Sequence, residues 1–375
     1  MQMINLEERW QYRIEEPILQ IEIGDVNNSG QNEIIAASKS GRLLILSLTG
    51  KVLADKKITE KSSIWKVEVR DINNDNKNEI ILAGLDGLLR VFKCNSSYEL
   101  ETFWNHQFGA SISGFLVSDI NNDNLKEIIA YSIDKSLRVL NPLDGSLIWG
   151  QLFEDGIGNA IVWQDPSEPA LKEVIAAGND GTVRIFKGMN GELSWFKRYT
   201  DKIRCVSLFK LNKEEHIVCG GDDKMLHFID KKSHNEKKTI QCQEYVWKCS
   251  QFKSMRNYNL LVSTYSFDFF DSLINIDDLE FNSKLMCFNQ DFNINWEINN
   301  VNVETVSHVI LKGYKFFIIG TTRGKTLLIE DNTGKILIEI KKKSCVNDVK
   351  FDLDIKTLIT CHDDGSLFAY FLGKS

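Results

Sequence analysis

Two Trp-Lys pairs, Trp65-Lys66 and Trp247-Lys248, combine residue types that bind ligands through stacking and charge. The face of an indole ring attracts cations and planar groups, and a neighbouring ammonium attracts anions. Together with Arg204, which stands at the corresponding position of another repeat, they could hold an anionic or planar ligand or an arginine-rich loop of a partner. The alternative is that these tryptophans only pack within the fold, because an exposed aromatic residue need not be functional.

Residues 266–283, with the sequence SFDFFDSLINIDDLEFNS, form the longest irregular stretch of the chain. This insertion has no basic residue and alternates acidic with hydrophobic side chains, a pattern typical of segments that dock on a partner protein. The candidate contact residues are Phe267, Asp268, Phe269, Phe270, Asp271, Asp277 and Asp278. The alternative is a short amphipathic hairpin or helix that folds down onto its own sheet.

The cysteines and histidines do not form a recognisable metal or catalytic pattern. The eight cysteines are scattered and contain no CxxC pair, which predicts free buried thiols rather than a zinc site or disulfides. Cys361 and His362 are adjacent, but neighbouring residues of a strand point to opposite faces and would not ligate one ion together. No catalytic triad or phosphate-binding glycine loop is evident. We therefore expect no catalytic residues and no cofactor other than a metal ion.

Composition and charge exclude several classes of protein. The net charge of -7 argues against a nucleic-acid partner, which needs a concentrated cationic surface. The N-terminal stretch has no apolar export segment, and no run of 18 apolar residues occurs, which predicts a cytoplasmic protein without membrane insertion. Only four prolines occur in 375 residues, so a proline-rich linker between domains is not expected.

The candidate residues belong to a repeated pattern that is most complete between Ile64 and Phe92. An alternating run, an Asp/Asn-rich turn, an apolar run, an Asp-Gly turn and a second alternating run predict three antiparallel strands joined by hairpins. The aliphatic residue that opens the first strand recurs every 43 to 48 residues, with one interval of 57 at the insertion. These opening residues are Ile18, Ile64, Ile112, Ile157, Ile203, Val246, Val303 and Val346.

Self-similarity at this period predicts a β-propeller, in which each unit is a four-stranded sheet that cannot bury both faces alone. Eight openings predict an all-β, eight-bladed propeller that forms a single domain over residues 1–375. Seven blades are the alternative if the fifth or sixth unit is irregular.

Tryptophans give an independent check on this register. Trp10 precedes Ile18 by eight residues, and the same interval separates Trp104, Trp149 and Trp195 from the next opening residue. Residues 8–14 are therefore predicted to be a fourth strand that completes the last blade and closes the ring. The indole rings of these tryptophans are predicted to pack between adjacent sheets.

Two families share features with these repeats. The turns GDVNNSGQNEII, RDINNDNKNEII and SDINNDNLKEII resemble those of FG-GAP/VCBS repeats. The phrases DGSLIW and NGELSW resemble the tryptophan-docking repeats of quinoprotein-like (PQQ-like) propellers. The FG-GAP-like turns are confined to the first three units.

The resemblance to FG-GAP repeats implies calcium binding in these turns, where oxygen donors can converge on a hard cation. The implied ligands are Asp71, Asn73, Asp75 and Glu79 in the second unit, and Asp119, Asn121, Asp123 and Glu127 in the third. The first unit has Ser29 in place of a carboxylate, so we expect weaker binding there. The alternative is that Asp and Asn only build the hairpin, with the glutamate exposed at the start of the strand.

These observations favour a non-enzymatic scaffold that binds other proteins through one propeller face and the insertion. The first alternative is a calcium-binding, FG-GAP-like propeller that binds a ligand. The second is a quinone-dependent dehydrogenase, which the quinoprotein-like repeats imply. An enzyme is disfavoured because the chain lacks an export signal and an adjacent cysteine pair, and because fold alone does not determine function.

Overall fold

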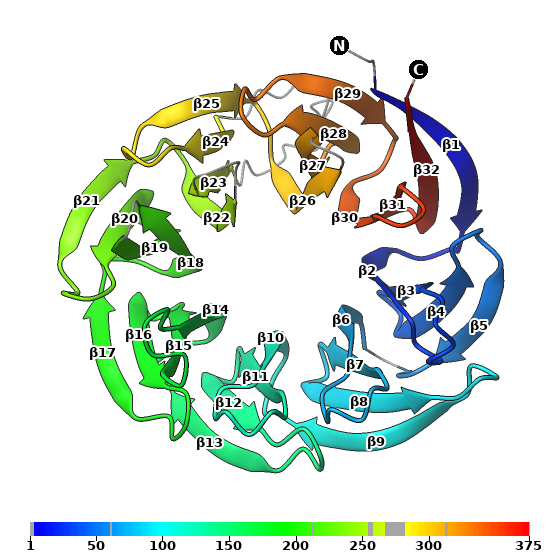
Figure 1. The fold of residues 1–375 in the computed structure, drawn as a ribbon, viewed down its shortest axis with the longest axis horizontal. Helices are drawn as coiled ribbons and strands as arrows, with labels where there is room; N and C mark the ends of the chain where they lie inside the picture. Colours follow the sequence, from blue (N-terminus) through cyan, green and yellow to red (C-terminus); the bar gives the residue numbers. More distant parts are fainter. Residues whose placement is uncertain are drawn as a thin grey trace. The chain divides into compact units, whose positions relative to one another are not determined.

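The fold consists of eight four-stranded antiparallel sheets, seen in a computed structural model that describes residues 4–60, 62–211, 214–253, 258–266, 282–311 and 314–374. Each sheet is one blade (Figure 1). All elements assigned within these residues are strands, so the described part of the chain contains no helix that could cross a bilayer. The prediction of an all-β propeller with eight blades is confirmed, and the seven-bladed alternative is wrong.

The first four blades each consist of four consecutive strands. Blade 1 contains β2 (Ile18–Gly24), β3 (Glu33–Ser38), β4 (Arg42–Ser47) and β5 (Val52–Lys57). Blade 2 contains β6 (Ile64–Arg70), β7 (Glu79–Gly84), β8 (Leu88–Cys94) and β9 (Leu100–Gln107). Blade 3 contains β10 (Ile112–Ser118), β11 (Glu127–Ser132), β12 (Ser136–Leu140) and β13 (Leu147–Leu152). Blade 4 contains β14 (Ile157–Gln164), β15 (Lys172–Gly178), β16 (Thr182–Lys187) and β17 (Leu193–Arg198).

The next three blades follow the same order, and the eighth uses both ends of the chain. Blade 5 contains β18 (Ile203–Leu211), β19 (Glu214–Gly221), β20 (Met225–Asp230) and β21 (Glu236–Gln241). Blade 6 contains β22 (Tyr245–Lys253), β23 (Tyr258–Tyr265), β24 (Lys284–Phe288) and β25 (Ile294–Asn299). Blade 7 contains β26 (Val303–Leu311), β27 (Tyr314–Thr321), β28 (Lys325–Glu330) and β29 (Ile336–Lys341). Blade 8 contains β30 (Val346–Asp352), β31 (Thr357–His362), β32 (Ser366–Lys374) and β1 (Ile4–Arg13).

Strand β1 is the outer strand of blade 8, where it is hydrogen-bonded to β32 (Figure 1). Next to it, the backbone amide of Ile14 donates to the carbonyl of Gly365 over 3.0 Å. The Ile14 side chain belongs to a buried cluster that also contains Leu367 of blade 8 and Leu44 of blade 1. The prediction that the N-terminal strand completes the last blade is therefore confirmed.

The chain forms two compact units, which are described separately below. One unit comprises Glu8–Arg198 and Ile359–Tyr370 and contains blades 1 to 4. The other comprises Met1–Glu7, Tyr199–Leu358 and Phe371–Ser375 and contains blades 5 to 7. That the whole chain forms a single domain stays a prediction.

The core lies between blades, because the second strand of each blade is buried along nearly its whole length. These strands are continuous aliphatic runs that end in small residues, a sequence suited to burial on both faces. In one cluster Ile81 and Val91 of blade 2 pack with Phe115 and Ile128 of blade 3. Blades 6 and 7 are joined similarly through Trp296 and Phe317.

Four outer-strand tryptophans each attach their own blade to the next one, at the junctions of blades 8 and 1, 2 and 3, 3 and 4, and 6 and 7. Each donates its indole N–H to a backbone carbonyl of the next blade, over 2.8 to 3.0 Å; the pairs are Trp10–Leu48, Trp104–Pro142, Trp149–Gly188 and Trp296–Asp331. Each indole ring lies against a glycine of the hairpin that supplies this carbonyl. These glycines are Gly50, Gly145, Gly191 and Gly334. All four glycines have positive φ angles between 69° and 85°. The indoles are thus packing residues with a satisfied polar end, as predicted.

Candidate interaction surface

A β-bulge shapes the start of the first strand in blades 1 to 7. Strand pairing shifts register immediately after the opening residue, for example between Ile203 and Cys205 and between Val246 and Lys248. The residue at the bulge has no direct partner on the second strand, so a bulge can redirect its side chain. Arg204, Trp247 and Glu304 occupy these positions in blades 5, 6 and 7.

Arg204 and Trp247 come together in the unit that contains blades 5 to 7. The Arg204 guanidinium lies 5.7 Å from the centroid of the Trp247 ring. It also donates two hydrogen bonds to the Asp222 carboxylate, over 2.7 and 2.6 Å. These bonds raise the pKa of Arg204 above its ordinary value. The bidentate pair fixes the guanidinium plane beside the indole.

Tyr265 and Glu304 extend this cluster. The rings of Trp247 and Tyr265 lie 5.1 Å apart, and the Tyr265 hydroxyl donates to Glu304 Oε1 over 3.2 Å. Lys248 turns toward blade 7 and donates its ammonium to the Glu304 carbonyl, while burial lowers the pKa of this lysine. We call Arg204, Asp222, Trp247, Tyr265 and Glu304 the blade 5–7 cluster. It presents aromatic faces beside charges of both signs.

The described ends of the insertion are attached next to this cluster. Ser266 follows Tyr265 directly, and its amide and carbonyl both bond the Asn302 side chain over 3.2 Å. At the other end, the amide of Val301 donates to the Ser283 carbonyl over 3.4 Å. The predicted contact residues Phe267, Asp268, Phe269, Phe270, Asp271, Asp277 and Asp278 lie outside the described residues.

The first Trp-Lys pair lies in the other unit and has different contacts. Trp65 donates its indole N–H to the Ile112 carbonyl of the next blade over 2.8 Å. The Lys66 ammonium lies 5.2 Å from the centroid of the Phe115 ring. Lys66 also lines a cavity of about 300 Å³ with the Glu68–Arg70 ion pair. The indole N–H of Trp65 is therefore used in joining blades, whereas Lys66 borders an open space.

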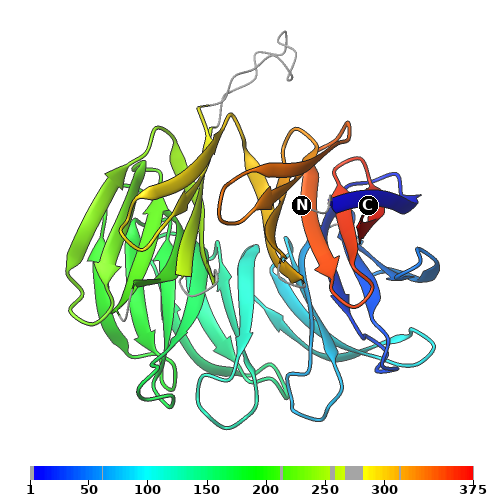
Figure 2. The ribbon, with the colours of Figure 1, turned by 45° about the horizontal axis from the view of Figure 1, so that its top comes forward.

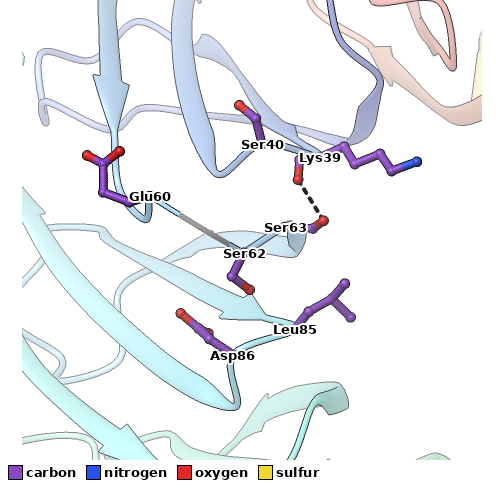
Figure 3. Close-up of a pocket in the computed structure, with 7 residues that line it drawn as sticks. All are labelled: Lys39, Ser40, Glu60, Ser62, Ser63, Leu85 and Asp86. Atoms are coloured by element: carbon purple, nitrogen blue, oxygen red, sulfur yellow. Dashed lines mark hydrogen bonds between the residues drawn. The ribbon is translucent and has the colours of Figure 1, made fainter.

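A second cavity, of about 440 Å³, lies between blades 1 and 2 (Figure 3). Six of its seven lining residues are polar or charged, and Ser63 donates its hydroxyl to the Lys39 carbonyl over 2.6 Å at one side. The Asp86 carboxylate on the opposite side is held by Arg90 at 2.5 Å. No prediction from the sequence includes this cavity.

The Asp/Asn hairpins after β6 and β10 project beyond the ends of their strands (Figure 2). In the first of these, Glu79 Oε2 accepts the amide of Ile72 over 3.2 Å, and the Asn73 side chain donates to Asp75 and Glu79. Glu127 bonds its hairpin in the same way. Glu79 and Glu127 are 0% and 1% exposed, so the alternative in which these glutamates are exposed at the start of the strand is wrong on this point. Their carboxylates instead accept hydrogen bonds from a backbone amide and an asparagine side chain of the hairpin.

Calcium fits the second-unit hairpin better than the third. Asp71 Oδ1 is buried and, within the described residues, has no hydrogen-bond partner. Burial, with the nearby charge of Asp75, raises the pKa of Glu79 to about 7. A divalent cation would satisfy the free oxygen and stabilise the ionised glutamate. In the third unit both Asp119 oxygens accept backbone amides, and the Lys172 ammonium lies 3.6 Å from Oδ2.

Sequence reasoning did not identify Asp222 and Tyr265 as parts of the cluster. Asp222 follows the last residue of β19, and Tyr265 is the last residue of β23. The recurring turn aspartates Asp86 and Asp180 correspond to Asp223, so the only signal for Asp222 was its place next to this repeated aspartate. Tyr265 carried no comparable signal, because its role depends on the neighbouring blade.

The fold and these surfaces define an eight-bladed β-propeller with a charged aromatic cluster beside an insertion. A family model described as the lambda-carrageenase β-propeller domain matches residues 142–267. No curated protein matches the chain.

Solved structures with low sequence identity share this fold. Saccharomyces cerevisiae Sqt1 has a TM-score of 0.76 at 10% identity, covering 100% of both chains. BamB from Moraxella catarrhalis has a TM-score of 0.64 at 13% identity, covering 98% of this chain and 100% of its own. BBS1N, solved in complex with ARL6DN, has a TM-score of 0.60 at 12% identity, covering 82% of this chain and 92% of its own.

Proposed function

We propose that this propeller is an interaction scaffold that binds another protein at the blade 5–7 cluster. The single observation that carries the proposal is the contact series Arg204–Trp247–Tyr265–Glu304 directly beside the attached ends of the insertion. Aromatic and arginine residues are the types that contribute most to protein interfaces. BBS1N, one of the similar structures, was solved with a protein partner.

The chemistry of this region favours a basic partner segment. The insertion contains Asp268, Asp271, Asp277, Asp278 and Glu280 and no Lys or Arg. Glu304 adds a carboxylate to the cluster, and the Trp247 face accepts a cation. The cluster's own cation, Arg204, is neutralised by Asp222. A lysine- or arginine-rich segment would therefore meet complementary charge and a stacking surface.

Site-specific crosslinking tests this proposal. We replace Trp247 with a photoreactive phenylalanine analogue and irradiate the full chain in extract from its source cells. The control carries the same analogue at Phe196, which is 56% exposed on β17. We expect a discrete protein adduct at position 247 that is absent at position 196 and is lost in Glu304→Lys. Identical adducts at both positions would refute the proposal.

The role of the insertion is tested separately. Residues 267–281 are replaced by a short glycine-serine linker, with Ser266 and Ser283 retained because their backbone bonds attach the ends. We expect the adduct at position 247 to be lost while the thermal midpoint is unchanged. Retention of the adduct would limit the interface to the cluster.

Calcium binding is a second candidate function, favoured by the free Asp71 oxygen and the buried Glu79. We expect calcium to raise the thermal midpoint relative to excess chelator, and Glu79→Gln to abolish that shift. The matched control is Glu127→Gln in the third unit, where Lys172 lies beside the first carboxylate. An equal loss in both variants would contradict the preference for the second unit, and no calcium shift would exclude the site.

A further inference from the structure

Blade 5 brings an imidazole and two carboxylates together across two strands. His216 on β19 pairs directly with Asp230 on β20, so the two side chains lie on one face of the sheet. Glu214 lies two residues before His216 and points to the same face. One potential ligand atom from each of the three residues lies within 4.8 Å of the other two.

The histidine in this group is buried with unused bonding capacity. His216 is 3% exposed, and within the described residues its Nδ1 atom has no hydrogen-bond partner. A buried polar atom without a partner destabilises the folded state.

The Asp230 carboxylate is held in place by its own turn. Ser233 donates both its amide and its hydroxyl to Oδ1, each over 2.6 Å. The other oxygen lies 4.0 Å from the ammonium of Lys237, a half-exposed side chain that can move aside.

A packing role accounts for only part of this arrangement. The His216 ring contacts Phe292 edge-on, with the centroids 5.7 Å apart, and this contact fixes the ring plane. Packing does not require Glu214 and Asp230 to converge on the ring. In blades 1 to 4 the position of His216 is a glutamate, so the change to imidazole in blade 5 creates a mixed nitrogen and oxygen donor set.

We propose that Glu214, His216 and Asp230 bind one divalent transition-metal ion, with water in the remaining coordination positions. One imidazole and two carboxylates suit ions such as Zn²⁺, Mn²⁺ or Co²⁺ better than Ca²⁺, which prefers oxygen donors alone. The exposed Glu214 gives the ion access from solvent. The site is independent of the proposed partner surface.

Cobalt binding to the chelator-treated full chain tests the proposal. Co²⁺ reports its ligands through visible absorption, and thiolate charge-transfer bands would reveal binding to any of the eight cysteines instead. We expect one Co²⁺ per chain without thiolate bands, displaced by Zn²⁺. Thiolate bands, or no binding, would overturn the proposal.

Three variants locate the site. His216→Gln is expected to abolish Co²⁺ binding. Glu214→Gln removes an exposed carboxylate and should weaken binding at least about tenfold without changing the thermal midpoint of the metal-free protein. Glu215→Gln, at the adjacent position on the opposite face of β19, is the matched control and should bind as the parent does. Binding that survives both ligand substitutions, or that is lost equally in Glu215→Gln, would overturn the proposal.

Discussion

Blades 1 to 4 and blades 5 to 7 differ at one equivalent position near the start of the second strand. In blades 1 to 4 it is a buried glutamate, at positions 33, 79, 127 and 173, whereas blades 5 to 7 have His216, Leu260 and Phe316. In blades 1 to 3 the glutamate accepts an amide from a long Asp/Asn hairpin. Only two residues separate β18 from β19 in blade 5, compared with eight between β2 and β3 in blade 1.

A second position shows the same contrast. In blades 2 to 4 an aspartate in the turn pairs with an arginine four residues later; these pairs are Asp86–Arg90, Asp134–Arg138 and Asp180–Arg184. In blade 5 the spacing is kept, but His227 replaces arginine and contacts Asp223 at 2.9 Å and Glu236 at 2.6 Å. The regular blades use these positions to fix turns, whereas blade 5 places imidazoles among carboxylates there. Residues capable of new chemistry therefore occur where the repeat departs from its pattern.

The largest loss of unfolding free energy is expected in blade 8. This blade belongs to neither set, because its strands come from both chain ends. Deletion of residues 1–14 removes β1 and the buried Ile14 and should cost at least about 4 kcal/mol of unfolding free energy. Denaturant titration measures this loss. A synthetic peptide of residues 1–14 should restore part of it, and an unchanged unfolding midpoint after deletion would contradict the assignment.

The next largest loss of stability is expected for Gly145 in blade 3, in comparison with His234, the equivalent turn residue of blade 5. A Cβ on Gly145 would lie 2.4 Å from the Trp104 ring, at a φ of 69°. Gly145→Ala should therefore destabilise the protein by about 3 kcal/mol. His234 already carries a side chain at a φ of 59°, so His234→Ala should change stability by less than about 0.5 kcal/mol. Thermal and urea unfolding would show whether the two substitutions differ in this order.

The Asp-Arg pairs of blades 2 to 4 should make the free energy of unfolding depend on pH. Burial would raise the pKa of Asp180, but hydrogen bonds from Thr182 and Glu154 and the charge of Arg184 hold it below its ordinary value. Its contribution is therefore present above about pH 4 and is lost as the pH falls through the lowered pKa. Asp180→Asn should cost about 1 to 2 kcal/mol at pH 7 and progressively less below pH 4. Urea unfolding between pH 3 and pH 7 measures this, and a cost that does not change with pH would argue against it.

The smallest effect concerns the outer strands of blades 3 and 4. Leu152 on β13 is 72% exposed and Phe196 on β17 is 56% exposed, so neither contributes much to the core. Replacing both with threonine should change unfolding free energy by less than about 0.5 kcal/mol. A larger loss would mean that these side chains support the regular blades more than their exposure indicates.

Hydrophobic patterning predicted most of the fold because strand position depends mainly on local alternation. Seven first strands begin at the predicted opening residue, and β22 begins one residue before Val246. Strands β19, β23 and β27 begin two residues before the position at which Glu33, Glu79 and Glu127 start the second strands of blades 1 to 3. These strands pair with the preceding strand as far as Glu214, Tyr258 and Tyr314, and a pattern based on the longer Asp/Asn hairpins could not anticipate this.

The candidate surface was less predictable because it depends on contacts between repeats. Arg204 and Trp247 were identified by residue type, but Asp222 and Tyr265 acquire their roles only when neighbouring blades meet. The direction of Lys248 toward blade 7 also depends on the next blade. The glutamates of the Asp/Asn hairpins were found by spacing, whereas their burial follows from packing that no local pattern encodes.

The placement of β1 has a consequence for synthesis on the ribosome. Arg13 bonds the backbone of Asp364, a partner that is translated 351 residues later. Strand β1 is therefore synthesised long before β32, the strand that covers its edge. Throughout that interval a nascent chain exposes an unpaired strand, and a chaperone that shields it would shorten the time available for aggregation.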